Sequence, residues 1–125
     1  MSYLFGFVGY YYSFNYSDMP LENQVTSLKL SKRLKSLGAK QDSLFFWTDK
    51  GLMSDEWIIE SGVGVKIASA FTSVELGDML KVSGKSFPLW SQARKEWYWL
   101  DMTSKTEANI RAKTLIYLIE NKLIK

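Results

Sequence analysis

The chain has 125 residues, of which 46% are hydrophobic and 23% are charged, and its formal net charge is +3. This length and balance are typical of one folded domain that buries a core without metals or disulfides. The chain contains no Cys and no His, which excludes Cys- or His-ligated zinc, thiolate nucleophiles, Ser–His–Asp triads and imidazole acid–base catalysis.

Residues 1–20 are a tyrosine-rich N-terminal segment that we expect to form an arm or a strand. Its apolar run, residues 1–14, lacks the basic region and cleavage site of a signal peptide. The run is also shorter than a membrane span requires, so we expect no membrane association. Residues 21–125 are predicted to form a single α+β domain.

The first helix is predicted over residues 24–37 or 27–37. Three leucines recur on one helical face: Leu30, Leu34 and Leu37. Gly38 follows at the position where a glycine commonly ends a helix. Four basic residues lie on the other faces: Lys29, Lys32, Arg33 and Lys35. Such a face is usually only solvated, and contact with phosphate is the alternative.

Three short strands are predicted next, over residues 44–48, around residues 57–59 and over residues 63–70. Tight turns between them favour an antiparallel meander. A helix-turn-helix over residues 30–47 is the alternative for the first part. Its second helix would carry little polar surface for reading bases, so we prefer helix–turn–strand.

Thr72 and Glu75 have the spacing of a capping box, which predicts a short helix over residues 73–81. Residues 89–92 and 96–101 then predict a hairpin. In its second strand Trp97 and Trp99 share one face and Tyr98 takes the other.

The last helix is predicted from a second capping box, Ser104 and Glu107, to about Asn121. Its small residues Ala108 and Ala112 favour close packing on a sheet. The fold predicted for the chain is therefore α+β, with an antiparallel sheet of about five strands on which this long helix and two shorter helices pack.

The predicted hairpin carries a cluster of aromatic and basic residues. The exposed candidates are Trp90, Arg94, Lys95 and Tyr98. Core packing of the tryptophans with charges at the hairpin tip is one interpretation. A protein-binding face and a surface that stacks nucleic-acid bases are the two others.

Two other patterns were tested for chemistry. Residues 83–86 contain the Gly-Lys-Ser of a phosphate-binding loop, but Met79 stands where the motif requires its first glycine, so we interpret them as an exposed loop. Carboxylates near aromatic residues or helix starts are Glu56, Glu60, Glu75, Asp78 and Glu96. Their spacing defines no catalytic pair. We therefore expect no enzymatic activity, no cofactor and no metal site.

Three segments resemble, in the same order, the signature blocks of a small family of uncharacterised proteins from phages, prophages and other bacterial mobile elements. They are residues 30–47, 70–80 and 106–121. Lys122 stands where family members usually have a glycine, and the N-terminal arm lies outside the pattern. The resemblance implies no catalytic or ligand-binding residues.

The expected function is that of a non-enzymatic accessory protein of a phage or mobile element in the cytoplasm of the bacterial host. It is expected to contact another phage or host protein, as a monomer or homodimer. The alternative is a nucleic-acid-binding protein, with weak binding through the basic helix and the Trp-rich hairpin. The candidate interaction surface comprises Lys29, Lys32, Arg33, Lys35, Trp90, Arg94, Lys95 and Tyr98.

Overall fold

The computed structural model describes residues 19–81 and 88–124. Its helices are α1 (Leu28–Ser36), α2 (Asp55–Ser61), α3 (Ser73–Lys81) and α4 (Glu107–Glu120), after a 3₁₀ turn at Leu21–Asn23. Its strands are β1 (Phe45–Thr48), β2 (Gly51–Ser54), β3 (Lys66–Ala70), β4 (Leu89–Ser91), β5 (Glu96–Trp99) and β6 (Met102–Ser104). The predicted α+β class is confirmed. Almost all of the N-terminal arm and the loop at residues 83–86 lie outside the described residues.

The described strands form two three-stranded antiparallel sheets, with the orders β2-β1-β3 and β4-β5-β6. The prediction of about five strands in one sheet is therefore wrong. The outer edge of β3 explains why the sheet ends there. Lys35 Nζ donates to the Ile67 carbonyl at 2.7 Å, and Gln41 Oε1 accepts from the Ser69 amide at 2.8 Å. These side chains satisfy edge groups of β3 that a further strand would otherwise bind.

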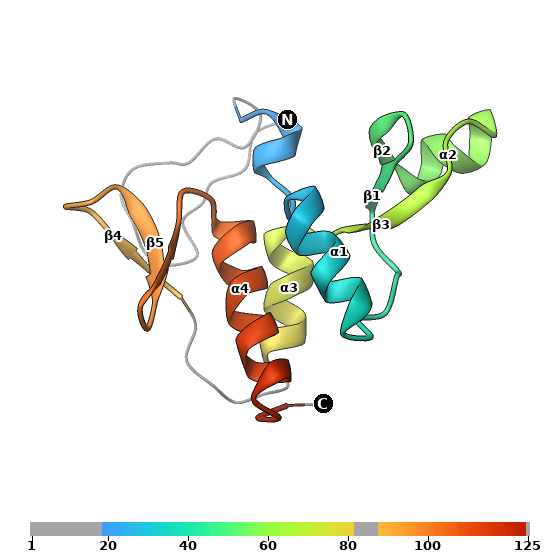
Figure 1. The fold of residues 1–125 in the computed structure, drawn as a ribbon. Coiled ribbons are helices and arrows are strands. Elements are labelled where there is room, and N and C mark those ends of the chain that lie inside the picture. Colours follow the sequence, from blue (N-terminus) through green and yellow to red (C-terminus); the bar gives the residue numbers. More distant parts are fainter. Residues whose placement is uncertain (1–18, 82–87, 125) are drawn as a thin grey trace.

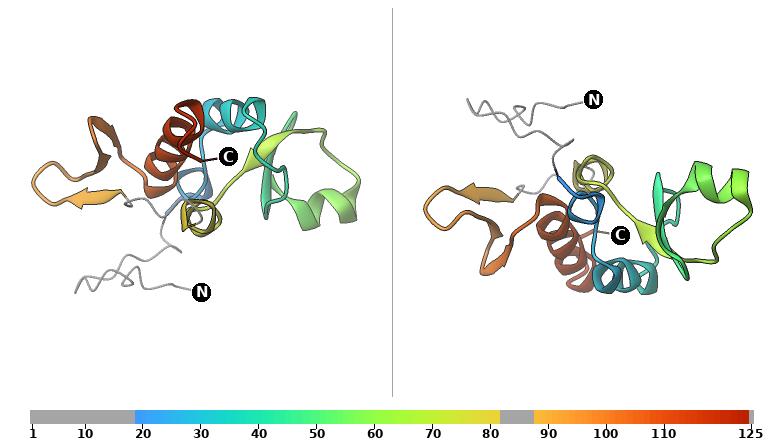
Figure 2. Two further views of the ribbon diagram at one scale, coloured as in Figure 1. Left: turned by 90° about the horizontal axis from the view of Figure 1, so that it is seen from below. Right: turned by 90° about the horizontal axis from the view of Figure 1, so that it is seen from above.

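Helices α1, α3 and α4 occupy the middle of the molecule, with one sheet on each side (Figures 1 and 2). Their buried core includes Leu34 of α1, Leu76 and Leu80 of α3, and Ala108, Ala112 and Leu115 of α4. The small face of α4 therefore packs on α3, and not across a sheet as predicted. Gly77 of α3 leaves room for the Arg111 side chain of α4, because a Cβ there would lie 2.5 Å from Arg111 Nη1.

Residues 57–59 belong to α2, so the strand predicted there is wrong. Their type favours strands, but the flanking residues specify a short helix. Ser54 Oγ accepts from the Trp57 amide at 3.1 Å, and Gly62 ends the helix with φ of 68°. Asp55 and Glu56 place negative charge in the first turn of α2, where it interacts favourably with the partial positive charge of the helix N-terminus.

The predicted start of α4 is also corrected. Thr106, and not Ser104, caps the helix, and its Oγ1 accepts from the Asn109 amide at 3.2 Å. Ser104 is held in β6 opposite Trp97. Glu107 forms a buried ion pair with Arg111 at 3.0 Å. Strand pairing therefore engages Ser104, and an ion pair within α4 engages Glu107, so the two do not form the predicted capping box.

The end of α4 at Asn121 agrees with the prediction. The backbone amide of Leu123 donates to the Leu118 carbonyl at 2.8 Å, and that of Lys122 donates to the Ile119 carbonyl at 3.0 Å. These two bonds define a Schellman motif. Lys122 adopts the left-handed conformation with φ of 57°, which glycine adopts most readily.

The predicted meander is wrong, because β1 lies between β2 and β3 and α2 separates β2 from β3 along the chain. The predicted strands also differ in extent, since β3 begins at Lys66, β5 ends at Trp99, and β6 follows as a third strand of the second sheet.

The capping box of α3 and the glycine after α1 are confirmed. Thr72 Oγ1 accepts from the Glu75 amide at 3.2 Å, and Glu75 Oε1 accepts from the Thr72 amide at 2.8 Å, which completes the capping box of α3. Gly38 has φ of 92° after α1. Phe45 starts a strand, which excludes the helix-turn-helix alternative.

Candidate functional site

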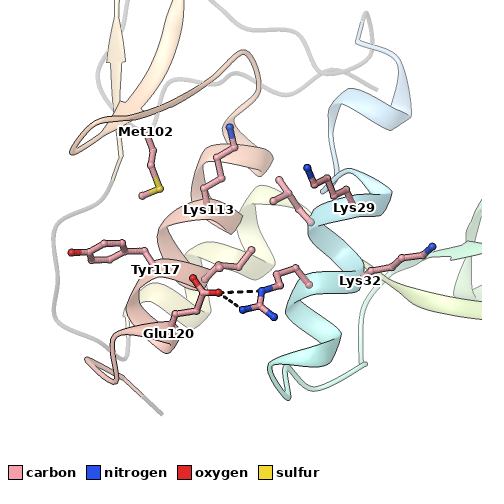
Figure 3. A pocket seen from close by; sticks show the side chains of 9 residues that line it. Lys29, Lys32, Met102, Lys113, Tyr117 and Glu120 are labelled. Carbon is pink, nitrogen blue, oxygen red and sulfur yellow. Dashed lines mark hydrogen bonds and ion pairs between the residues drawn. The ribbon is translucent and has the colours of Figure 1, made fainter.

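Helices α1 and α4 lie side by side and border an open groove of about 550 Å³ (Figure 3). Its apolar residues are Leu30, Met102, Ile116 and Tyr117. Its charged residues are Lys29, Lys32, Arg33, Lys113 and Glu120. The groove thus combines an apolar floor with a rim on which cations outnumber carboxylates. We call it the α1–α4 groove.

The start of α1 is fixed against the start of α4. Ser27 Oγ caps α1 by accepting from the Leu30 amide at 3.3 Å. The backbone amide of Ser27 itself donates to Asn109 Oδ1 at 2.9 Å. Because one residue serves both contacts, the start of α1 is held against the first turn of α4, and this fixes one end of the groove.

An ion pair bridges the two walls of the groove. Arg33 Nε donates to Glu120 Oε2 at 3.1 Å, and Arg33 Nη2 donates to the same oxygen (dashed lines in Figure 3). Both side chains are about half exposed, so the pair contributes only about 0–1 kcal/mol to stability. Its effect is to neutralise the one carboxylate among the groove residues.

Some of the remaining basic residues near the groove form hydrogen bonds within the protein, and others do not. Lys113 Nζ donates to the Thr103 carbonyl at 2.7 Å, which ties α4 to β6. Lys35 is bound to the edge of β3 and does not line the groove. Lys29 and Lys32 are exposed, and their ammonium groups form no hydrogen bond or ion pair with other residues of the described chain. These two lysines are the cations available to a partner.

The hairpin tryptophans pack inward: Trp97 is buried, and Trp90, expected to be exposed, is half-buried. Trp90 is paired with Trp97 across β4 and β5, and their rings meet edge to face at 5.5 Å. Trp97 is 7% exposed and packs with Ile110 of α4. The interpretation of Trp97 as a core residue is therefore confirmed, and its ring is not available for base stacking.

The hairpin tip carries the other candidate residues. The Arg94 guanidinium lies over the Tyr98 ring, 5.6 Å from its centroid, and its Nε is 3.6 Å from Glu96 Oε1. Lys95 makes the turn with φ of 55°. Arg94 is already paired with a ring and a carboxylate, so the tip presents less free positive charge than its sequence suggests.

The eight candidate residues do not form one surface. Lys29, Lys32 and Arg33 line the groove. The hairpin residues Trp90, Arg94, Lys95 and Tyr98 lie on the β4–β5 side of the molecule, which extends away from α1 (Figure 1). Only the base of that sheet reaches the groove, through Met102.

Sequence reasoning missed the α4 wall of the groove. Lys113, Tyr117 and Glu120 recur at spacings of four and three, which places them on one helical face. This spacing can be read from the sequence, but the apolar stripe that α4 buries is the more regular pattern of the two. Met102 had no comparable signal, because its place in the groove depends on tertiary packing.

A second open cavity, of about 830 Å³, lies beside α2. It is lined by Asp42, Ser43, Leu44, Phe45, Ser54, Asp55, Glu56, Ile59, Glu60 and Glu75. It brings together three of the carboxylates considered from the sequence: Glu56, Glu60 and Glu75. Glu75 is occupied, because its Oε1 accepts from the Thr72 amide and its Oε2 accepts from the Leu44 amide. In residues 19–81 and 88–124, no three such side chains are arranged to hold a metal ion.

None of the helices that the structure describes is both long and apolar enough to span a bilayer. Comparison of the chain with protein-family models, with curated proteins and with solved structures finds no match.

Proposed function

We propose that the protein is a non-enzymatic accessory protein of a phage or other bacterial mobile element, and that it binds another protein through the α1–α4 groove. The observation that carries this proposal is the composition of the groove. An apolar floor from two helices is bordered by Lys29 and Lys32, whose ammonium groups have no partner among the described residues.

The groove fits an acidic, amphipathic helical segment. In helix-in-groove recognition a few apolar side chains fill the floor of a groove and polar groups meet at its edges. Leu30, Ile116 and Met102 provide such a floor, and a volume of about 550 Å³ accommodates several anchoring side chains. The rim lysines then select for carboxylates on the partner and speed its association.

The assignment to a mobile element rests on the resemblance of residues 30–47, 70–80 and 106–121 to a family from phages and prophages. In that setting the partner is a phage or host protein in the bacterial cytoplasm. A binding protein of this kind needs no cofactor, which agrees with a chain that lacks both Cys and His.

Nucleic-acid binding is the second candidate. It is favoured by the exposed Lys29 and Lys32 and by the cation-bearing hairpin tip at Arg94 and Lys95. It is weakened by the burial of Trp97 and by the distance between the two surfaces (Figure 1). Binding through phosphate contacts falls steeply as salt rises, because counterions are released.

Affinity capture from a lysate of the bacterial host distinguishes the two candidates. The full chain, the groove variant Lys29→Glu/Lys32→Glu and the hairpin variant Arg94→Glu/Lys95→Glu serve as baits, each with and without nuclease. We expect a protein partner that survives nuclease, is lost with the groove variant and is kept with the hairpin variant. Equal capture by the groove variant contradicts the proposal, and loss of all partners after nuclease favours the second candidate.

A further inference from the structure

We infer that the partner in the α1–α4 groove is a second copy of this chain, which inserts the surface around its α2, so that copies associate head to tail. This inference rests on the proposed protein-binding function of the groove. It identifies which acidic, amphipathic segment the groove receives.

The chain itself carries a surface with the required chemistry. We define the α2 surface as Leu44, Glu56, Ile59 and Glu60, which line the same cavity. Glu56, Ile59 and Glu60 share one face of α2, at spacings of three and four. Leu44 is 64% exposed and Ile59 is 72% exposed. Two apolar side chains flanked by two exposed carboxylates match the apolar floor and cationic rim of the groove.

The charges favour a contact between unlike surfaces. The cavity at α2 is lined by five carboxylates and by no Lys or Arg. Two of the five are paired, Asp55 with Lys66 and Asp42 with Lys40. The exposed Glu56 and Glu60 form no ion pair with the residues that the structure describes. The groove is lined by four cations and by Glu120, which is already paired with Arg33. Groove against groove, or α2 against α2, would place like charges together. Groove against α2 places opposite charges together, which selects a heterologous interface.

The fold prevents a chain from filling its own groove. Helix α2 lies beyond β1 and β3, on the side away from α1 and α4, in both Figure 1 and Figure 2. It starts directly after β2, and Asp55 is held by Lys66 of β3 at 2.7 Å. The α2 surface therefore cannot enter the groove of its own chain, and only the groove of another copy can receive it. Each contact leaves one groove and one α2 surface free, so the assembly grows into an open chain or closes into a ring.

Sedimentation velocity on the full chain tests this inference. We expect the mean mass to rise as the protein concentration increases to about 500 µM. We expect it to fall when NaCl is raised from about 50 mM to about 500 mM, because salt screens the charge pairs. The groove variant Lys29→Glu/Lys32→Glu and the α2 variant Ile59→Asp each raise the dissociation constant about ten-fold or more.

Ile59→Asp has a matched control in the same chain. Val74 of α3 is also 72% exposed and lines neither cavity. Val74→Asp therefore adds the same charge at an equally exposed site, and we expect it to assemble like the wild type. Circular dichroism of each variant confirms that the fold is kept.

Mixing gives the sharpest result. The groove variant keeps an intact α2 surface, and Ile59→Asp keeps an intact groove. An equimolar mixture should therefore form heterodimers and no larger species, although each variant alone stays monomeric.

A wild type that stays monomeric, an Ile59→Asp variant that assembles normally, or a mixture that does not combine overturns the inference. A monomeric wild type that still captures a nuclease-resistant partner through its groove leaves the proposed function standing. Unchanged capture by the groove variant overturns that function as well.

Discussion

Trp99 of β5 packs edge-on against Tyr117 of α4, with ring centroids 5.5 Å apart and ring planes at 71°. Tyr117 lines the α1–α4 groove, and Trp99 belongs to the hairpin sheet. Figure 3 shows the Tyr117 side chain directed away from α1. This contact holds the β4–β6 sheet at the edge of the groove, together with the bond between Lys113 and the Thr103 carbonyl and the packing of Trp97 on Ile110.

A double-mutant cycle measures this contact. Edge-to-face aromatic pairs contribute about 0.5–1.5 kcal/mol beyond the area they bury. We expect Trp99→Leu and Tyr117→Leu to show a coupling of that size when the free energy of unfolding is measured in urea. Because Leu replaces each ring with apolar volume, most of the burial is kept. If the effects of the two changes add to within about 0.3 kcal/mol, the contact is not a specific one.

Lys122 offers a stabilising substitution. It holds the left-handed position of the Schellman motif that ends α4, with φ of 57°. A side chain in this conformation costs about 1 kcal/mol, and glycine avoids that cost. We expect Lys122→Gly to raise the free energy of unfolding by about 0.5–1 kcal/mol. Lys122→Ala is the control, because it removes the charge and keeps the strain. An equal gain for both variants would mean that the charge, and not the backbone, is responsible.

Thr26 joins α1 to the end of β3 through a buried hydroxyl. Its Oγ1 accepts from the Phe71 amide at 3.0 Å and shares a hydrogen bond of 2.6 Å with Ser31 Oγ. Thr26, Ser31 and Phe71 are all fully buried. We expect Thr26→Val to lower the free energy of unfolding by about 1–3 kcal/mol, because the Phe71 amide loses its acceptor. Thr26→Ser keeps the hydroxyl and should retain slow exchange of the Phe71 amide, whereas Thr26→Val should speed it. Equal exchange in the two variants would show that the hydroxyl is not what protects that amide.

The local elements of the fold follow from short-range signals. The caps at Thr72 and Glu75 and the glycine at position 38 identify α1 and α3 correctly, since each signal concerns residues within one turn. The strand propensity of residues 57–59 is outweighed by the two residues that flank them. Ser54 caps the start of α2 and Gly62 ends it, and both signals are present in the sequence.

Features that depend on distant residues could not be predicted. Arg33 and Glu120 are 87 positions apart, and no periodicity shows that α1 lies beside α4. The division into two sheets depends on Lys35 and Gln41, whose side chains cover the β3 edge. The sequence therefore identified the basic residues of α1, but only the structure shows that Lys29 and Lys32 border an apolar groove and that Lys35 does not.

Site-specific photocrosslinking tests the central claim, that the α1–α4 groove receives a protein partner. A photoreactive residue is placed at Lys29, on the rim of the groove, or at Lys95, on the hairpin tip, and cells of the bacterial host are irradiated. We expect a protein crosslink from position 29 that is lost when the exposed Lys32 on the rim of the groove is changed to Glu, and none from position 95. Crosslinks from position 95 alone, or a crosslink from position 29 that Lys32→Glu leaves unchanged, would contradict the claim.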